Sequence, residues 1–481
     1  MTHRVLLAWV FMTAERKVET EGFRSLPEQA AAVLRLNDMG GWTKAAPALY
    51  PHQWSWDSGF ISIGLAHLDS GRAINELRTL FDKQWDSGKV PHIVFNPEAP
   101  PNSYFPGPEH WTNTGDFPGA PPYTSALCQP PIHAVGAWRI RELALERGDG
   151  AEIGEVDSFL AELYPKLLAW HRYLLTERDP QGSGLVTVYH PWESGTDNSP
   201  RWDAAMDAIE VGEMPGFRRR DLSHVEDVSE RPTDGEYQRY IWLVEKIKRT
   251  RCHEEELQKT HPFRVKDVLM SAILVRANEV LLRIAEVVGA PQSERAEISR
   301  RAELGRAGLE LCWDEEYGLY LDYDVVSEKP LRSRTVAGFG PLFAGGTDEG
   351  RVRRMLATMD SRHFLGDERL ARPLPPSTSP SEARFHPRSY WRGPVWPVVS
   401  WLLWRSLLDL GEKSRADRIL NESLEQISTG GFAEYFEPFT GGPLGSGDQS
   451  WTAAVVLDWC DHLRRTTFQP GSLRAGRRSE S

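Results

Sequence analysis

The sequence predicts a mostly α-helical protein, and three observations lead to this fold class. Apolar residues recur at spacings of three and four in segments spread over most of the chain, which is the pattern of a helix with one buried face. Extended segments are few and short. Long loops rich in tryptophan, tyrosine and proline separate the helical segments, and we expect these loops to gather at one end of a helical toroid.

The helices follow one another along the chain. A first helix is expected from Ser25 to about residue 37, because Ser-Leu-Pro-Glu has the form of a capping box with proline in the first turn. The longest uninterrupted helical pattern covers 265–288 and stops at Gly289. A short strand is expected at 185–189. Further helices are expected at 74–85, 129–143, 159–175, 293–313, 347–359, 395–409, 414–427 and 449–463.

Loops and chain ends complete this organisation. Residues 46–57 are expected to form an aromatic-rich loop, and the charge-rich segment 210–231 to cross one mouth of the fold. Prolines exclude a helix over 372–380, where we expect a mobile lid. The expected units are an N-terminal extension at 1–24, a main helical unit at 25–466 with cap insertions at about 86–128 and 179–236, and a disordered tail at 467–481.

Composition excludes several classes of function. The formal net charge of −12 disfavours a nucleic-acid or anionic-membrane partner. No apolar run approaches the roughly 20 residues of a membrane span. The apolar run at 5–12 is short and is followed by no cleavage site, which predicts a cytoplasmic protein. The four cysteines are scattered without metal-ligand spacing, so we expect reduced, buried thiols and neither a metal nor another cofactor.

One loop, 190–203, concentrates groups suited to cleaving a sugar bond. It holds the three carboxylates Glu193, Asp197 and Asp203, together with an arginine and two tryptophans. Glycoside hydrolysis needs a protonated carboxyl that delivers a proton and an ionised one that attacks or activates water. An indole can cover the apolar face of a sugar and raise the pKa of a nearby carboxyl. The alternative is a surface loop in which Asp203 caps the next helix.

A second acidic loop, 430–442, carries Glu434 and Glu437. Its paired glycines allow a close approach of the backbone to a ligand. Glu434 lies 237 residues from Asp197 (434 − 197), so only tertiary folding could bring the two carboxyls together. The alternative is a pair of solvated surface acids.

The motif Glu-Ser-Gly-x-Asp-x-Ser-x-Arg-Trp at 193–202 resembles the general-acid signature of trehalases and of glycoside hydrolase family 63. Over 192–203 it is similar to the mannosylglycerate and glucosylglycerate hydrolases of that family, and the resemblance covers about residues 28–463. It implies an (α/α)6 barrel whose long loops cap the mouth of the active site. It also implies that Asp197 is the general acid and Glu434 the general base, while Glu437 makes structural hydrogen bonds.

The resemblance also implies which residues bind the substrate. Arg231 and Tyr237 match a stretch whose arginine and tyrosine hold the carboxylate of glycerate, and a guanidinium presents two parallel donors to such a group. The alternative for Arg231 is a surface salt bridge. Within the aromatic motif at 390–397, Arg392 would pair with an acid and Trp396 would pack in the core. The other expected substrate-binding residues are Tyr50, Trp56, Asp57, Tyr104, Gln129, Trp192, Gly195, Tyr390, Trp391 and Gln449.

The expected activity is inverting hydrolysis of α-mannosylglycerate or α-glucosylglycerate to sugar and glycerate. Inversion would require the two catalytic carboxyls to stand roughly 6.5–9.5 Å apart. One alternative is an α-glucosidase or trehalase-like enzyme acting on neutral sugars, and another is a helical toroid that binds glycans without catalysis. The sequence does not separate mannose from glucose, and it leaves open whether the protein forms a homo-oligomer.

Overall fold

The computed structural model describes residues 25–467 except 48–49, 101–102, 113–116, 118, 221, 223–226 and 346–347. The expected N-terminal extension, and the expected tail beyond residue 467, lie outside the described residues.

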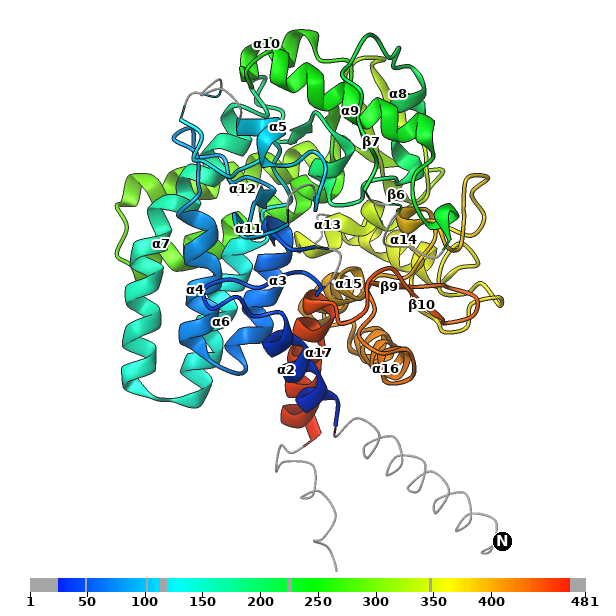
Figure 1. Cartoon of the computed structure of the whole chain (residues 1–481). Coiled ribbons are helices and arrows are strands. Elements are labelled where there is room, and N and C mark those ends of the chain that lie inside the picture. The colour runs from blue at the N-terminus through cyan, green and yellow to red at the C-terminus, as the bar shows by residue number, and fades with distance from the viewer. Residues whose placement is uncertain are drawn as a thin grey trace, which may run out of the picture.

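Within the described residues, six inner helices form a closed ring in which each packs against the next (Figure 1). The ring closes because the last helix of the chain packs against the first inner helix. One member is only a single turn, prolonged at its start by the 3-10 turn Val336–Phe339. The inner helices are α3 (Ser55–Ala66), α6 (His133–Arg147), α11 (Val268–Val287), α13 (Gly340–Phe343), α15 (Pro397–Asp409) and α17 (Ser450–Thr467).

An outer layer of helices covers the ring. Most outer helices pack directly on inner ones, whereas α14 lies against the strand β6. The helix α2 packs on α17, so the two ends of the described chain meet (Figure 1). The outer helices are α2 (Leu26–Leu36), α4 (Ser70–Phe81), α7 (Gly150–Thr176), α12 (Gln292–Glu310), α14 (Glu349–Asp360) and α16 (Lys413–Gly430). Two concentric rings of helices make an (α/α)6 barrel, and the expected fold class is confirmed.

Burial explains the difference between the two rings. Every residue of the inner helix α3 is buried, because outer helices cover one side of it and the barrel interior the other. The outer helix α4 instead buries one stripe that includes Ala73, Ile74, Leu77 and Leu80, at helical spacing. Asp69 caps α4 by accepting a hydrogen bond from the main-chain N–H of residue 72.

A cap lies above the barrel in Figure 1 and contains helices and a small sheet. The helices are α5 (Pro108–Thr112), α8 (Asp203–Asp207), α9 (Asp234–Arg249) and α10 (Glu254–Thr260). The antiparallel sheet has the order β3 (Thr187–Val188), β4 (Val265–Lys266), β7 (Asp322–Asp324) and β8 (Lys329–Leu331). β3 is the strand expected before the acidic loop. The remaining strands form pairs: β1 (Gln53–Trp54) with β2 (Ile93–Val94), β5 (Trp313–Asp314) with β6 (Leu319–Tyr320), and β9 (Tyr435–Phe436) with β10 (Pro443–Leu444).

Several local expectations were wrong. The Ser25 hydroxyl caps no helix and accepts instead from the Gln29 side chain. A capping box lies instead at α9, where Thr233 and Glu236 bond each other's main-chain N–H groups. The aromatic loop expected at 46–57 ends early, because α3 already begins at residue 55.

The segment 372–380 is not a lid over the mouth. Its centre is buried, and Thr378 forms a β-bridge with Thr335 while Pro376 forms one with Val395. Prolines exclude a helix there, as expected, but the neighbouring segments supply hydrogen bonds that fix the chain in the interior.

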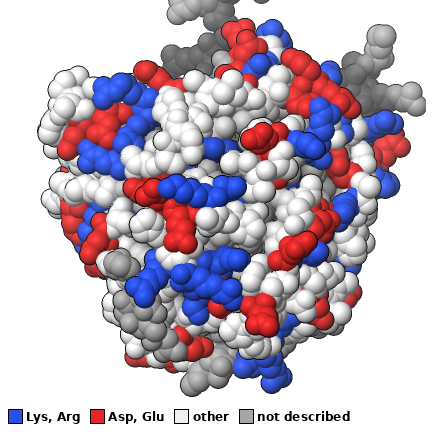
Figure 2. All heavy atoms as spheres, turned by 90° about the horizontal axis from the view of Figure 1, so that it is seen from above, with Lys and Arg blue, Asp and Glu red and all other residues white. Residues whose placement is uncertain are grey.

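The four cysteines are free thiols, and only Cys128 is fully buried, whereas Cys252, Cys312 and Cys460 are partly exposed. None of the described helices has the length and apolar character needed to cross a membrane. On the cap face seen in Figure 2, acidic and basic side chains are interspersed.

Candidate active site

A pocket opens where the inner helices begin. Trp56 and Asp57 lie in the first turn of α3, Gln129 precedes α6, and Trp391 precedes α15. Trp451 belongs to the first turn of α17. Because these N-terminal ends meet at one end of the barrel, their helix dipoles point positive charge at the pocket, which favours a negatively charged ligand.

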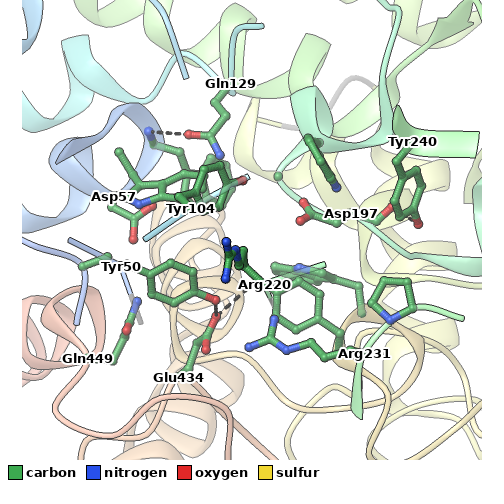
Figure 3. Close-up of a pocket in the computed structure, with 18 of the residues that line it drawn as sticks. Tyr50, Asp57, Tyr104, Gln129, Asp197, Arg220, Arg231, Tyr240, Glu434 and Gln449 are labelled. Carbon is green, nitrogen blue, oxygen red and sulfur yellow. Dashed lines mark hydrogen bonds between the residues drawn. The ribbon is translucent and has the colours of Figure 1, made fainter. Parts of the chain in front are cut away.

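Every residue expected from the sequence to act in catalysis or substrate binding lines this pocket. Residues more than 380 positions apart in the chain therefore meet in one cavity, as Tyr50 and Glu434 do through a hydrogen bond (Figure 3). The expected residues found there are Tyr50, Trp56, Asp57, Tyr104, Gln129, Trp192, Gly195, Asp197, Arg231, Tyr237, Tyr390, Trp391, Glu434 and Gln449.

Asp197 has the properties of a proton donor. Its pKa is raised to about 7, first because burial disfavours the charged form and further because Glu434 is negative, while Arg231 acts in the opposite direction. The loop turns towards the pocket at Gly195, which has a positive φ of 71° and packs near Trp56. A carboxyl with a pKa near 7 can carry a proton at neutral pH and release it to a substrate.

Glu193, in the same loop, has the opposite properties. It is fully buried, and both of its oxygens accept hydrogen bonds from the Arg178 guanidinium at 2.9 Å. Burial alone would raise the pKa of Glu193, but Arg178 holds it down at about 2. Glu193 therefore stays ionised and fastens the loop by accepting from the main-chain N–H groups of Tyr189 and Cys128.

A second buried arginine, Arg201, also holds the acidic loop in place. Arg201 donates to Asp267 and Asp322 and also to the hydroxyl of Thr196, the residue before Asp197. Breaking any of these buried ion pairs would leave a charge without a partner, so the network holds the acidic loop in one conformation.

Asp203 caps no helix. Trp202 occupies that position, and the Asp203 carboxylate instead pairs with Arg392 at 2.5 Å. Arg392 also pairs with Glu236 at 2.9 Å, which is the acid pairing expected for this arginine. The Trp396 ring is buried and stacked on Trp391 with 3.8 Å between ring centroids, as expected for a packing residue.

Glu434 faces Asp197 across the pocket (Figure 3). One of its oxygens accepts from the phenols of Tyr50 at 3.0 Å and Tyr390 at 3.2 Å, and the other from the N–H and hydroxyl of Ser446. Four donors suit an ionised carboxylate, which can only accept hydrogen bonds. An ionised carboxylate opposite a protonated one is the pairing that activates water while the other delivers a proton.

Glu437, the other acid of this loop, does not line the pocket. Its carboxylate accepts from the main-chain N–H groups of Phe439 and Thr440. The structural role expected for Glu437 is therefore confirmed.

Arg231 lies in the pocket wall and is only 7% exposed. Its Nε and Nη2 atoms donate no hydrogen bond, and it forms no ion pair with a described acidic residue. Its guanidinium lies over the Tyr390 ring, 4.8 Å from the ring centroid. A buried guanidinium without an anion is costly, so the site fits a ligand that brings a negative charge.

Asp57 is also buried in the pocket wall, and no other described residue donates a hydrogen bond to its carboxylate. Burial raises the pKa of Asp57 well above its usual value, and the negative charge of Glu434 raises it further. Sugar hydroxyls would supply the missing partners. Among the described residues, no group of three or more His, Cys, Asp or Glu side chains is arranged to hold a metal ion.

Some pocket residues were not expected from the sequence. The most informative is Arg220, whose side chain reaches the pocket from the segment that was expected to cross the mouth (Figure 3). The signal was the run of three arginines at 218–220, which could not show which of them points inward. The other unexpected lining residues are Ala45, Trp54, Ser103, Phe105, Pro232, Tyr240 and Trp451.

Known proteins match the chain over most of its length. A glucosylglycerate hydrolase of Mycolicibacterium hassiacum is 45% identical over 436 residues, which cover 90% of this chain and 97% of that protein. A mannosylglycerate hydrolase of Thermus thermophilus is 40% identical over 432 residues, which cover 90% of this chain and 99% of that protein.

Solved structures agree. The crystal structure of a GH63 mannosylglycerate hydrolase from Thermus thermophilus in complex with Tris and D-glycerate matches with a TM-score of 0.83 at 38% identity, covering 90% of this chain and all of that one. A neutral trehalase from Saccharomyces cerevisiae, at 13% identity and a TM-score of 0.51, shares the fold alone. A family model described as the mannosylglycerate hydrolase MGH1-like glycoside hydrolase domain matches residues 50–452, and the chain belongs to this family of glycoside hydrolases.

Proposed function

We propose that this glycosidase cleaves α-glucosylglycerate, α-mannosylglycerate or both to the free sugar and glycerate, with inversion at the anomeric carbon. Asp197 donates its proton to the glycosidic oxygen as the bond to the sugar breaks. Glu434 removes a proton from a water molecule that attacks the opposite face of the ring. The raised pKa of Asp197 and the four hydrogen-bond donors around Glu434 support this division of roles.

The observation that carries the substrate assignment is Arg231. Its guanidinium is buried in the wall of the same pocket, and two of its nitrogens lack a partner. A glycerate carboxylate would accept two parallel hydrogen bonds from this group and neutralise its charge. Relatives named as glucosylglycerate and mannosylglycerate hydrolases fit this assignment.

A neutral disaccharide fits the pocket less well. Trehalose, or another neutral α-glucoside, would bring no carboxylate to the guanidinium of Arg231 and would leave two of its buried nitrogens without a charged partner. A protein that only binds glycans is also disfavoured. Binding needs neither a carboxyl whose pKa is raised to about 7 nor a second carboxylate across the pocket.

A substrate comparison tests the proposal. Purified protein is incubated with glucosylglycerate, mannosylglycerate, trehalose and kojibiose, and sugar release is followed by proton NMR so that the first anomer formed is seen. We expect release from one or both glycerate conjugates only, with the β-anomer appearing first. Equal turnover of trehalose would contradict the substrate class, and the α-anomer appearing first would contradict inversion.

A further inference from the structure

The residue after the proposed acid is tied directly to the loop that supports the proposed base. Asn198 is buried next to Asp197, and its Oδ1 atom accepts a hydrogen bond from the main-chain N–H of Trp391 at 2.8 Å. Its Nδ2 atom donates to the Ser389 hydroxyl at 3.3 Å. A main-chain N–H can only donate, so the orientation of this amide is defined. One carboxamide therefore bonds to the residues on both sides of Tyr390.

Tyr390 has a backbone conformation that needs such support. Its φ is +43°, in the left-handed region that residues with a large side chain rarely adopt. Such a conformation persists only where the surroundings impose it. In addition to the bonds between Asn198 and the residues on either side of Tyr390, the carbonyl of Tyr390 accepts a hydrogen bond from the indole N–H of Trp396 at 3.3 Å.

The imposed conformation places the Tyr390 side chain between two functional groups. Its phenol donates to the Glu434 carboxylate at 3.2 Å, and its ring lies 4.8 Å from the Arg231 guanidinium carbon. Tyr390 thus bonds directly to the proposed base, while the cation proposed to hold glycerate only lies against the face of its ring.

We propose that Asn198 is a positioning residue that fixes the separation between Asp197 and Glu434. This inference rests on the proposed function, because it takes these two residues as acid and base. Asn198 directly follows the proposed acid Asp197 in the chain. Its side chain bonds to the residues on both sides of Tyr390, and the Tyr390 phenol donates to the proposed base Glu434. One continuous connection therefore joins both sides of the pocket. An inverting hydrolase needs a fixed gap that admits one water molecule. A displacement of about 1 Å in such a site can lower the rate on the order of a hundredfold.

The test is a double-mutant cycle between Asn198→Ala and Tyr390→Phe, measured on whichever glycoside the wild-type protein hydrolyses. We expect Asn198→Ala to lower kcat about ten- to a hundredfold while KM changes by no more than about threefold, because the groups that contact substrate remain. The double variant should lose no more kcat than the more damaging single variant, because both substitutions break the same connection. Losses that multiply would overturn the inference.

A matched control separates positioning from general stability. Asn278 of α11 is equally buried, does not line the pocket, and bonds to His171 at 2.9 Å. Asn278→Ala should lower Tm and leave kcat unchanged. A result in which Asn198→Ala lowers Tm but also leaves kcat unchanged would make Asn198 merely structural. If Asn198→Ala does not fold, Ser389→Ala removes only the weaker of the two bonds and takes its place in the cycle, with a smaller loss of kcat expected.

The choice of assay also separates this inference from the substrate assignment. If the protein hydrolyses a neutral glucoside instead of a glycerate conjugate, the cycle is still measurable, and its outcome still decides the role of Asn198. Normal turnover by an Asp197→Asn variant would instead remove the premise and overturn both proposals.

Discussion

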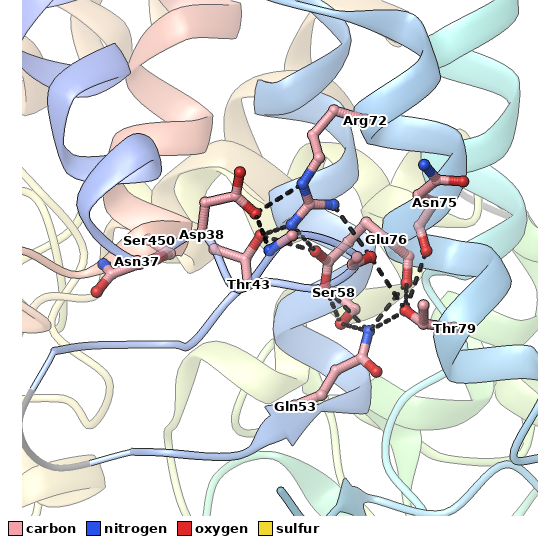
Figure 4. A network of polar contacts seen from close by, with 12 residues as sticks. Asn37, Asp38, Thr43, Gln53, Ser58, Arg72, Asn75, Glu76, Thr79 and Ser450 are labelled. Atoms are coloured by element: carbon pink, nitrogen blue, oxygen red, sulfur yellow. Dashed lines mark hydrogen bonds and ion pairs between the residues drawn. The ribbon is translucent and has the colours of Figure 1, made fainter. Parts of the chain in front are cut away.

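Two neighbouring clusters of buried charge differ in whether their charges are paired within the protein. In the first cluster, Glu76 of α4 is completely buried and accepts hydrogen bonds from Thr43 and Ser58 at 2.7 Å, Gln53 at 3.1 Å and Arg72 at 3.2 Å (Figure 4). These donors join α4 to the start of α3 and to the segment before it. The cluster is complete without a ligand.

The second cluster begins one residue away, at Asp57, which precedes Ser58 in α3. Asp57 is buried, with no hydrogen bond to its carboxylate from another described residue, and the buried Arg231 keeps two nitrogens without a partner. Both line the pocket. Buried polar groups without hydrogen-bond partners cost free energy, so this arrangement is expected where a ligand supplies the missing partners. The difference supports a structural role for the buried Glu76 and the proposed ligand-binding role for the buried Asp57.

The largest expected effect comes from Asp197→Asn, in the pocket that the second cluster lines. The substitution keeps the size of the side chain but removes the proton that the carboxyl delivers. We expect kcat to fall by about 10²–10⁴-fold, the usual range for one general acid, while substrate binding persists. Sugar release and isothermal titration calorimetry measure the two quantities. Normal sugar release would remove Asp197 from its role.

Replacing Glu434 by Gln should reduce kcat by a similar factor of about 10²–10⁴, because no base remains to activate water. The matched control is Glu437→Gln, in the same loop but outside the pocket. It should lower Tm, because Glu437 accepts two main-chain hydrogen bonds, and should affect kcat much less. An inactive Glu437→Gln that folds normally would mean that the wrong glutamate of the pair has been assigned.

Arg231 and Glu76 should separate function from stability. Arg231→Ala should cost about 1.5–3 kcal/mol of transition-state binding, which is roughly ten- to a hundredfold in kcat/KM at about 1.4 kcal/mol per decade. The loss should be confined to glycerate conjugates, so an aryl glucoside without a carboxylate serves as the control substrate. Equal damage to both substrates would make Arg231 structural.

Glu76→Gln should show the reverse pattern. It weakens a charged hydrogen-bond network outside the pocket and should reduce the free energy of unfolding by about 1.5–3 kcal/mol. The kcat/KM of the folded variant should stay within about twofold of wild type, since surface and core changes away from a site act on stability. Thermal unfolding and the same glycosidase assay measure both properties. A large loss of activity with unchanged Tm would contradict the division between the two clusters.

The last expected effect is a pH-dependent difference in stability. The pKa of Asp197 is about 7 in the folded protein against the usual 3.8, so the folded state binds a proton more tightly than the unfolded chain. The stabilisation from this proton is complete below about pH 4 and is lost as the pH rises through 7. Above pH 7, Asp197→Asn should therefore have a higher Tm than wild type, and the difference should shrink towards pH 5. A difference that does not vary with pH would contradict the raised pKa.

Local signals in the sequence were enough for most of the long helices, because the apolar spacing of three and four persists whatever the tertiary arrangement. They were not enough for the inner helices α3, which is buried on all sides, and α13, which is a single turn. The capping motif at Ser25 failed because a side-chain pattern only permits a capping box, and there the Gln29 side chain uses the hydroxyl instead. The proline-rich segment at 372–380 was correctly excluded from helices. Its burial depended on β-bridges to residues 335 and 395, which no local pattern reveals.

By itself, the sequence determined the helical class, the residue types of the site and, through its motifs, the family. Only the tertiary structure decided which of those residues meet, because Asp197 and Glu434 belong to loops that the closure of the barrel brings to one end. It also decided the protonation of the acidic loop, since burial and neighbouring charges raise the pKa of Asp197 to about 7 and hold that of Glu193 at about 2. Two carboxyls four residues apart in one loop thus differ because the pKa depends on the surroundings that folding builds around each of them.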